Sequence, residues 1–325
     1  MMKPSNILLS IAVLVSFWPT WLPAQPVAKH GRLSVEGTQL TDQHGEAVVL
    51  RGVSYGWHNW WPRFYNAQTV KWFRDDWGCS VVRAAMGVEP DRGYLNAREW
   101  SLDLIEEVVE AAIANDVYVI IDWHSHRFHV EEAKKFFAAM AKKYGHHPHV
   151  IYEIFNEPER VSWEEVKAYS LEVIASIREI DPDNIILVGS PHWCQDLHVV
   201  ADDPIAGHTN LMYTLHFYAA SHKQFLRDRC NYALGKGIPI FVSESAGMQA
   251  TGDGPLDLAE WQRWIDWMHS HQISWLTWSV ADKNETCSMI LPGASSNGGW
   301  SHADLKESGR LTRAYLRKFA GKAEE

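Results

Sequence analysis

The sequence has few cysteines, fewer basic than acidic residues, and a single long apolar run. Thirty lysines and arginines stand against 40 aspartates and glutamates, which gives a formal net charge of −10 over 325 residues. A surface with this excess repels phosphate backbones and anionic lipid. We therefore expect no nucleic acid among the partners of the chain. With 46% hydrophobic and 22% charged residues, the composition is that of a globular protein.

The four cysteines, Cys79, Cys194, Cys230 and Cys287, are too few for a small domain stapled by disulfides. They allow three complete pairings, and the sequence alone leaves one disulfide and none equally open. No cysteine precedes Cys79, so the N-terminal segment lacks the thiol that a bacterial lipoprotein needs. We therefore expect no lipid anchor.

The one long apolar run lies at the N-terminus. Lys3 precedes it, residues 7–17 form it, and the small residue Ala24 follows, which is the order of parts in a secretory signal peptide. We expect residues 1–24 to be removed and the protein to be secreted, to the periplasm or the cell exterior. Residues 25–325 would then form a mature monomer with no membrane anchor, since no later segment approaches the roughly 20 apolar residues of a membrane span.

Short β-branched runs alternate with longer amphipathic stretches from residue 47 onward, a pattern typical of βα units around a parallel sheet. Most of the short runs are continuously apolar, as in residues 117–121, which is expected of strands covered on both faces. Eight such runs predict an α/β fold, a single (β/α)8 TIM barrel, which needs about 250 residues. The predicted strands are 47–54, 80–86, 117–123, 150–156, 184–189, 211–217, 239–243 and 274–280.

The stretches between these runs predict helices, with a weaker signal at 195–201 in the fifth connection. Ser162 followed by Glu165 predicts a capping box at one helix start. Residues 33–40, before the first strand, are expected to form a small N-terminal β-hairpin on the barrel floor. No Pro/Ser-rich linker or internal repeat interrupts the chain, so we expect one barrel domain over residues 25–325. The predicted helices are 67–77, 102–115, 131–144, 163–180, 221–235, 257–271 and 308–319.

Polar residues interrupt the apolar runs where the predicted strands end. In a (β/α)8 barrel the carboxyl ends of the strands carry the catalytic groups, so we expect these side chains to converge on one mouth. They are Arg83 on the second strand, His124 on the third, Asn156 and Glu157 on the fourth, His216 and Tyr218 on the sixth, Glu244 on the seventh and Trp278 on the eighth.

Glu157 and Glu244 are the pair that predicts the chemistry. A carboxylate at the end of an apolar strand is costly to desolvate and needs a partner or a function. The fourth and seventh strands of an eight-stranded ring face each other across the mouth. This placement suits two carboxyls about 5–5.5 Å apart, the separation of retaining glycoside hydrolases, in which one carboxyl attacks the sugar and the other protonates the leaving oxygen.

The neighbours of the two glutamates suggest which does which. An acid needs a raised pKa, whereas a nucleophile stays ionised. Arg83 and Tyr218 can hold Glu244 charged through charge-assisted hydrogen bonds. Glu244 is therefore predicted to be the nucleophile and Glu157 the general acid/base. Asn156 can bind the sugar hydroxyl next to the anomeric carbon.

His124 and His126 form an H-x-H at a strand end, a spacing that metal-dependent hydrolase barrels also use. Such barrels usually carry this pair on the first strand, whereas here it follows the third, and the fourth ends in Asn156 and Glu157. We therefore expect no metal and no other cofactor. His124 and His216 are predicted to donate to the substrate or to the glutamates, and His126 to be a solvated loop residue.

Tryptophan is abundant, with 17 residues in the chain. Trp261, Trp264 and Trp267 recur at helical spacing, so we expect them in helix packing. Trp60 and Trp193 lie in predicted loops after strands, where an indole can stack on the apolar face of a sugar ring. The loop rings predict a cleft that binds carbohydrate.

The ordered motifs at the strand ends resemble those of glycoside hydrolase family 5, and within it the bacterial and nematode endo-β-1,4-glucanases. The resemblance extends from about residue 33 to residue 319. Asn-Glu-Pro alone is weak evidence, but the ordered set is specific. The motifs are Arg83-Ala84-Ala85-Met86, Ile121-Asp122-Trp123-His124, residues 151–158 ending in Asn-Glu-Pro, His216-Phe217-Tyr218 and Phe241-Val242-Ser243-Glu244.

This resemblance implies a retaining cellulase in which Glu157 is the acid/base and Glu244 the nucleophile. It also implies Trp60 and Trp193 as stacking positions, Lys283 and Glu285 as groups that bind glucose hydroxyls, and a β-glucan as substrate. Tyr94 is a further candidate for substrate binding. The residues implied on the glycone side of the active centre are Arg83, His124, Asn156, His216, Tyr218 and Trp278.

Two departures from the family pattern stand near the predicted site. Family members commonly place an aromatic residue and a glycine after the nucleophile, where this chain has Ser245 and Ala246. Some relatives carry a histidine at the position of Gly56, and here His58 lies two residues further on. The glutamates are unaffected, so the departures bear on rate or subsite preference.

Two alternative functions remain open at this point. The chain is similar enough to family 5 as a whole to act on another β-linked polysaccharide, such as mannan, xylan or xyloglucan. Lys283 and Glu285 favour glucan, because they are suited to reading equatorial hydroxyls. A non-catalytic carbohydrate-binding protein on the same scaffold is the second alternative, and the presence of both Glu157 and Glu244 argues against it.

Overall fold

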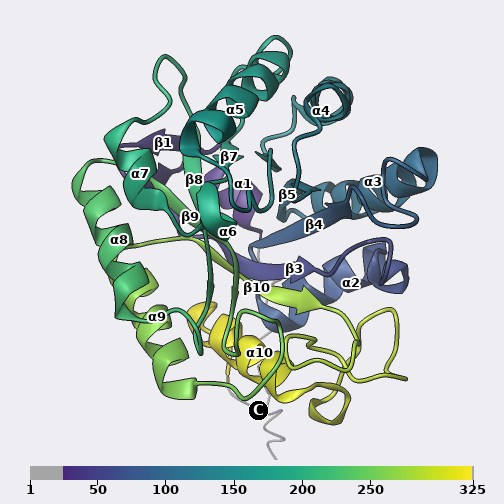
Figure 1. Cartoon of the computed structure of the whole chain (residues 1–325). Coiled ribbons are helices and arrows are strands. Elements are labelled where there is room, and N and C mark those ends of the chain that lie inside the picture. Colours follow the sequence, from purple (N-terminus) through teal and green to yellow (C-terminus); the bar gives the residue numbers. More distant parts are fainter. Residues whose placement is uncertain (1–24, 324–325) are drawn as a thin grey trace, which may run out of the picture.

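Eight parallel strands close into a barrel, as the sequence predicted, and helices surround it (Figure 1). The computed structural model describes residues 25–323, so the predicted signal peptide lies outside the described residues. Each predicted strand overlaps an observed one. The barrel strands are β3 (Arg51–Tyr55), β4 (Val81–Gly87), β5 (Tyr118–His124), β6 (Val150–Glu153), β7 (Ile186–Val188), β8 (Leu211–Tyr218), β9 (Ile240–Ala246) and β10 (Trp275–Val280).

The side chains of each strand alternate between two apolar layers, because successive residues of a strand point to opposite faces. On β5, Ile120 packs inside the barrel, while Val119 and Ile121 pack outward in the large cluster beneath the helices. The inner layer continues downward to Leu33 and Leu40. These two residues belong to the N-terminal hairpin segment, which therefore closes the barrel floor as predicted.

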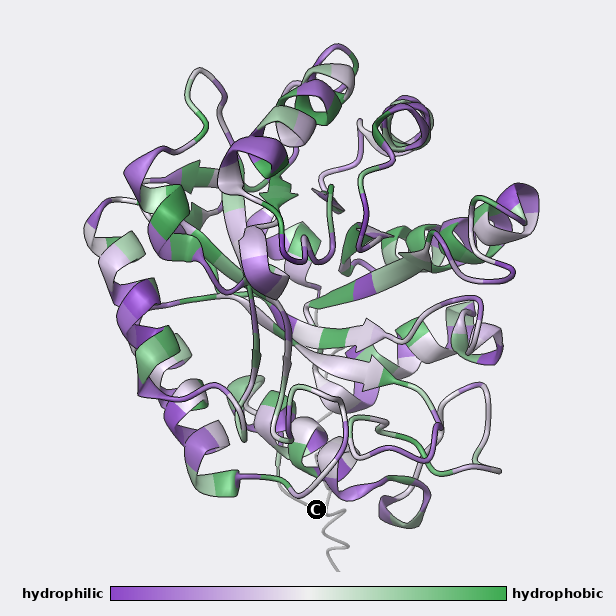
Figure 2. Ribbon diagram, in the orientation of Figure 1, coloured by the Kyte–Doolittle hydropathy of each residue, from purple (hydrophilic) through white to green (hydrophobic). Residues whose placement is uncertain are grey.

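The hairpin consists of β1 (Ser34–Glu36) and β2 (Gln39–Thr41), which pair antiparallel. The helices around the barrel carry both hydrophilic and hydrophobic residues (Figure 2), as expected of helices with one face on a core. They are α1 (Pro26–His30), α2 (Ala67–Trp72), α3 (Arg98–Ala114), α4 (Val130–Tyr144), α5 (Trp163–Arg178), α6 (Pro191–Cys194), α7 (Leu197–Asp202), α8 (Gln224–Gly235), α9 (Leu258–Ser270) and α10 (Glu307–Phe319), with 3-10 turns at Pro62–Phe64 and His302–Asp304.

One predicted helix differs from the structure, the observed helix α6 was not predicted, and two details are confirmed. The stretch 67–77 is not one α-helix: after α2 it widens into a π-helical turn, Phe73–Trp77, which ends at the left-handed Gly78. Helix α6 was missed, since its residues have no helical periodicity. The capping box of Ser162 and Glu165 is present at the start of α5. The tryptophans of α9 are buried in helix packing, as expected.

All four cysteines are buried as free thiols. Of the two alternatives that the sequence left open, one disulfide or none, the structure has none. In the part of the chain from residue 25 to 323, no helix is long and apolar enough to cross a membrane.

Gly52 on β3 makes a close approach that no larger residue can make. A Cβ atom built at this position would lie 1.7 Å from the carbonyl oxygen of Val81 on the neighbouring strand. We expect Gly52→Ala to lower Tm by at least about 5 °C, because the barrel wall must shift to relieve the overlap. Differential scanning calorimetry checks this. Gly235→Ala is the matched control, since nothing lies near its Cβ, and equal Tm values for the two variants would contradict the prediction.

Candidate active site

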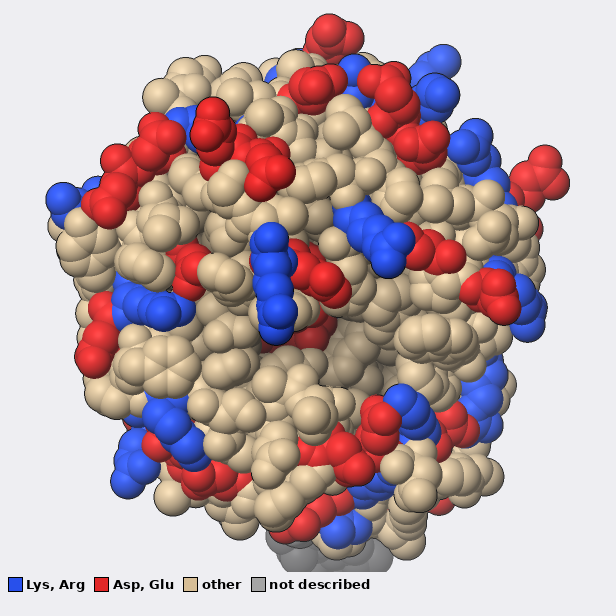
Figure 3. Space-filling view, in the orientation of Figure 1, with Lys and Arg blue, Asp and Glu red and all other residues tan. Residues whose placement is uncertain are grey.

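A cleft opens at the carboxyl ends of the barrel strands, and Glu157 lies at its centre. The molecular surface is hollowed there, with acidic side chains at the edge of the hollow (Figure 3). Two adjoining cavities of about 510 and 160 Å³ share Glu157 and Tyr218 in their walls. The larger one extends to Trp193, and the smaller one holds Glu244 and Trp60. The cleft is therefore continuous on both sides of the acidic pair.

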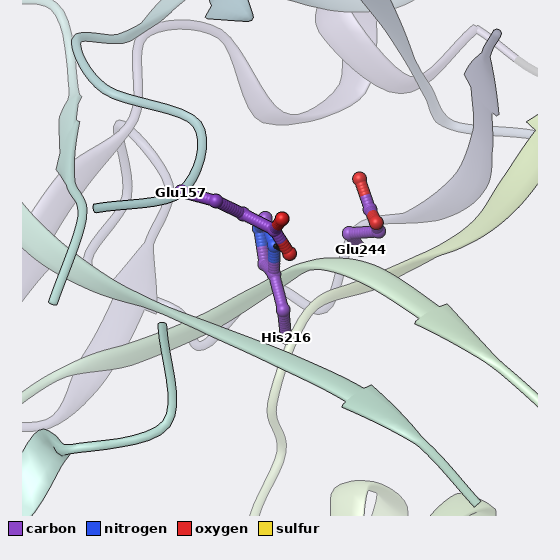
Figure 4. Close-up of side chains that lie close together, drawn as sticks. All are labelled: Glu157, His216 and Glu244. Atoms are coloured by element: carbon purple, nitrogen blue, oxygen red, sulfur yellow. Dashed lines mark hydrogen bonds and ion pairs between the residues drawn. The ribbon is translucent and has the colours of Figure 1, made fainter. Parts of the chain in front are cut away.

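Glu157 and Glu244 point toward each other across this cleft, with His216 beside Glu157 (Figure 4). One oxygen of each carboxyl and one ring nitrogen of His216 lie within 4.8 Å of one another. Inverting glycosidases hold their carboxyls about 6.5–9.5 Å apart, and retaining ones about 5–5.5 Å apart. The separation of this pair fits direct attack by one carboxyl, with no room for a water molecule between the sugar and that carboxyl.

Glu244 is fixed from two sides. The hydroxyl of Tyr218 donates to Oε1 at 2.6 Å, and Nη1 of Arg83 donates to Oε2 at 3.1 Å. Both bonds go to the ionised form of the carboxyl and orient it. These are the two contacts that the sequence predicted for Glu244.

Arg83 is fully buried beneath the pair and binds more than Glu244. Its Nε and Nη2 donate to the two oxygens of Glu153, at 2.8 and 3.2 Å. Nη2 also lies 2.7 Å from Oδ1 of Asn156 and 3.0 Å from Oδ2 of Asp122. The guanidinium therefore shares one positive charge among three carboxyls, and it joins β4, β5, β6 and β9 at the bottom of the site.

His216 links the same buried group to Glu157. The hydroxyl of Ser243 donates to Oε1 of Glu153 at 2.7 Å, so it accepts a hydrogen bond from Nε2–H of His216, 2.9 Å away. With Nε2 protonated, Nδ1 faces Oε1 of Glu157 at 2.9 Å, and one further proton joins these two atoms. A positive charge on His216 therefore favours the ionised form of Glu157.

The pKa directions of the two glutamates are opposite to the predicted ones. Burial raises the pKa of Glu244, and this effect exceeds the opposing effects of His216 and Arg83. Burial acts the same way on Glu157, but the hydrogen bond and the charge of His216 outweigh it and lower its pKa. Arg83 does not offset the burial of Glu244, because its charge is divided among several acids. The pKa of His216 is raised, because the surrounding acidic groups raise it more than burial lowers it. A charged His216 then lowers the pKa of Glu157.

His124 faces the cleft from the end of β5. Its Nδ1 lies 2.6 Å from Oδ2 of the buried Asp122, which fixes the ring orientation. Burial and the charge of Arg83 lower the pKa of His124, so the ring is neutral. It stacks on Trp278 at a centroid distance of 5.1 Å with the planes 3° apart. The pair makes a flat wall on the Glu244 side of the cleft.

Trp193 is presented by an unusual turn. His192, Trp193 and Cys194 all have left-handed backbones, with φ of 52°, 55° and 58°, a strained conformation for residues other than glycine. The backbone N–H of Trp193 donates to the carbonyl of Pro158 at 2.9 Å, and Sγ of Cys194 donates to the carbonyl of Asn156 at 3.1 Å. The turn thus ties the aromatic platform to the segment that carries Glu157.

Comparisons with known proteins agree with this geometry. The family model described as Cellulase (glycosyl hydrolase family 5) matches residues 41–284. The chain belongs to glycosyl hydrolase family 5. It is 44% identical to Endoglucanase 5 of Pectobacterium carotovorum over 306 residues, which is 92% of this chain and 60% of that protein. The family-5 chain therefore spans less than two thirds of the length of this relative.

Two solved structures are similar over most of the family-5 domain. One, from Cytophaga hutchinsonii, has a TM-score of 0.90 and 47% identity and covers 92% of this chain and 98% of its own. The other is the catalytic domain of a Thermobifida fusca endoglucanase in complex with cellotetraose, with a TM-score of 0.85, 34% identity, and coverage of 90% of this chain and 100% of its own. The mouth described above thus belongs to a family-5 barrel.

The predicted aromatic and polar substrate contacts are largely brought together. Trp60, with 54% of its surface exposed, and Trp278 line the smaller cavity together with Lys283 and Glu285. Lys283 and Glu285 form an ion pair with each other. Trp193 lines the larger cavity. These five side chains therefore line the cleft on both sides of the acidic pair.

Two predictions for substrate binding are wrong. Tyr94 is 3% exposed and packs on Trp123 and Phe136, at centroid distances of 5.2 and 5.6 Å. A tight turn, in which Gly93 N–H bonds to the carbonyl of Pro90 at 2.7 Å, precedes the ring as it enters the core. Arg83 is fully buried and contacts the acidic groups instead of the cleft, because its charge compensates theirs.

The two departures from the family pattern have structural explanations. The hydroxyl of Ser245 donates to the carbonyl of Leu276 on β10 at 2.8 Å. His58 does not take the place of a histidine at Gly56: it is fully buried, accepts from the backbone N–H of Gly87 at 2.9 Å and bonds to Ser101. Neither Ser245 nor His58 reaches the cleft.

The H-x-H histidines do not converge on a common point. The rings of His124 and His126 are 6.4 Å apart with planes at 80°. Among the described residues, the group with metal-ligand spacing consists of Glu157, His216 and Glu244. These are the acidic pair and its neighbouring histidine, whose hydrogen bonds are given above.

Sequence reasoning missed the buried supports and part of the cleft wall. Asp122 and Glu153 are charged residues inside apolar strands, which is a signal that could have marked them. Ser243 gives no such signal, since a serine in a strand is common. The cleft residues that were missed are Trp57, Gln195, Ser221, His222, Gln249 and Thr251.

Tyr218→Phe tests the support of Glu244. Loss of the hydroxyl removes a hydrogen bond to the charged carboxyl, so the pKa of Glu244 rises further. A nucleophile must be ionised, and the acid limb of the pH profile of kcat/KM on cellotetraose should therefore move to higher pH by about half to one unit. An acid limb that stays in place, in a variant with unchanged Tm, would show that this bond does not tune Glu244.

Proposed function

We propose that this family-5 protein is an endo-β-1,4-glucanase that hydrolyses internal bonds of cellulose or a related β-glucan with retention of configuration. The observation that carries the proposal is the close pair of Glu157 and Glu244 in the middle of an open cleft. In this proposal Glu244 is the nucleophile and Glu157 the general acid/base.

In the first step a carboxylate oxygen of Glu244 attacks the anomeric carbon of the sugar bound beside it. The bond to the glycosidic oxygen breaks, and Glu157 gives its proton to that oxygen, so the leaving chain departs as an alcohol. The amide nitrogen of Asn156 is suited to hold the neighbouring sugar hydroxyl, since its Oδ1 already accepts from Arg83. The product is a glycosyl ester of Glu244.

In the second step Glu157, now ionised, takes a proton from a water molecule, which attacks the anomeric carbon from the opposite side. The ester bond breaks, and Glu244 leaves as a carboxylate held by Tyr218 and Arg83. Two displacements restore the original configuration. Cleavage requires a proton on Glu157, and Oε1 is occupied by its contact with Nδ1 of His216. We therefore propose that the active form carries this proton on Oε2.

The substrate class follows from the cleft and the relatives. Endoglucanase 5 is a named endoglucanase, and the Thermobifida fusca structure holds cellotetraose. In this chain Trp60 and Trp193 flank the acidic pair on opposite sides, which suits stacking of successive glucose rings. The cleft continues past Glu157 in both directions, so a polysaccharide can bind by its interior.

We also propose that the protein is exported as a monomer without a membrane anchor. The support for export is the charged, apolar and small-residue order of the first 24 residues. Cellulose is too large to enter a cell, so an endoglucanase meets it outside the cytoplasm.

Replacement of the glutamates tests their roles. We expect Glu157→Gln and Glu244→Gln each to lower turnover of carboxymethyl cellulose at least about a hundredfold, with unchanged Tm. On 2,4-dinitrophenyl cellobioside with azide, Glu157→Ala should give the β-azide and Glu244→Ala the α-azide, because azide replaces water in the first and the nucleophile in the second. The opposite azide products would reverse the two roles.

Lys283→Ala tests the glucan contacts. We expect KM for cellotetraose to rise about three- to tenfold while kcat changes less, because a hydrogen bond made equally in the ground and transition states is lost. Lys142→Ala, on the exposed face of α4, is the control and should match the parent. An unchanged KM for Lys283→Ala would remove this residue from the substrate contacts.

A further inference from the structure

His126 lies closer to the acidic pair than a solvated loop histidine would. Its Nδ1 is 3.7 Å from Oε2 of Glu157 and 3.9 Å from Oε1 of Glu159. The same Nδ1 is buried and has no hydrogen-bond partner. His126 lies in the loop after β5, as predicted, but its ring is only partly solvated, because Nδ1 faces Glu157.

The ring of His126 is held by aromatic contacts. It stacks on Trp57 at a centroid distance of 5.7 Å with the planes 23° apart, and Trp57 in turn packs against Trp60 at 4.9 Å. His126 and Glu157 line the same cavity. A ring fixed in this way keeps Nδ1 directed at the carboxyl and holds the imidazole at the edge of the substrate path.

The two oxygens of Glu157 have different neighbours. Oε1 is bonded to His216 at 2.9 Å, and Oε2 faces His126. Because His216 takes Oε1, Oε2 is the oxygen that can deliver a proton to a leaving group. A positive charge on His126 at this distance favours the ionised carboxylate.

We propose that His126 is a positioning residue that acts on Glu157 through its charge, and that it sets the pH above which Glu157 no longer protonates the leaving group. This inference rests on the proposed role of Glu157 as general acid/base.

Other groups also act on the two residues. His126 is the most solvent-exposed of the basic ones, with 28% of its side chain accessible. The groups that face His126 are Glu159 and His124. The groups that face Glu157 are His216 and Tyr218 from β8, His222 from the turn after β8, Glu244 from β9 and Arg83 from β4.

The direction of the effect follows from the charge. Protonated His126 lowers the pKa of Glu157, so a neutral residue at position 126 lets the acid keep its proton to higher pH. A permanent cation there has the opposite effect. Glycosylation needs protonated Glu157, so the alkaline limb of kcat/KM reports this change.

The experiment measures kcat/KM against pH for the full chain with cellotetraose. We expect His126→Gln to move the alkaline limb upward by about half to one pH unit and His126→Lys to move it downward. His129→Gln is the matched control: His129 is in the same loop and pairs with Glu89 at 3.2 Å, so its profile should equal that of the parent.

A second substrate separates this role from a structural one. The leaving group of 2,4-dinitrophenyl cellobioside needs no protonation, so the shift should disappear with it. Alkaline limbs that coincide for His126→Gln, His126→Lys and the parent, or a shift of equal size on both substrates, would overturn the inference. If Glu157→Gln instead remains active on cellotetraose, the proposed function itself fails, which is a different result.

Discussion

The arrangement of the active site depends on one buried cation. Arg83 lies with no exposed surface under the mouth and contacts Glu153, Asp122 and Glu244. A charge removed from water in this way is tolerated only when its partners satisfy its donors. Here they do, and the partners come from three different strands. The position of Glu244 is therefore fixed by the closure of the barrel, and an error in strand register would separate Glu244 from Glu157.

The catalytic groups form one connected electrostatic unit instead of two independent acids. From Arg83 the hydrogen bonds run through Glu153 and Ser243 to His216, and from there to Glu157. A proton gained or lost at His216 changes the pKa of Glu157, while Glu244 receives its share of the charge of Arg83. The opposite pKa directions of the two glutamates follow from this division, and groups coupled so closely titrate as a pair.

The fold could be predicted from the sequence almost completely, because buried parallel strands give continuous apolar runs and the polar interruptions mark their ends. Glu157, Glu244 and Tyr218 were found for this reason. Glu153 was not found, since its role inside the strand depends on Arg83, a partner 70 residues away in sequence. Tyr94 was misplaced because the sequence of a loop does not reveal which way a turn directs its ring.

The free state of the four buried thiols has a consequence for where the chain can fold. Each sulfur is enclosed by the barrel and its helices and none is joined to another, so no covalent cross-link contributes to the native state. Burial also raises the pKa of all four thiols, which keeps them protonated and unreactive. The barrel domain therefore needs no oxidising compartment or disulfide isomerase, and a reducing cytoplasm suffices for its production.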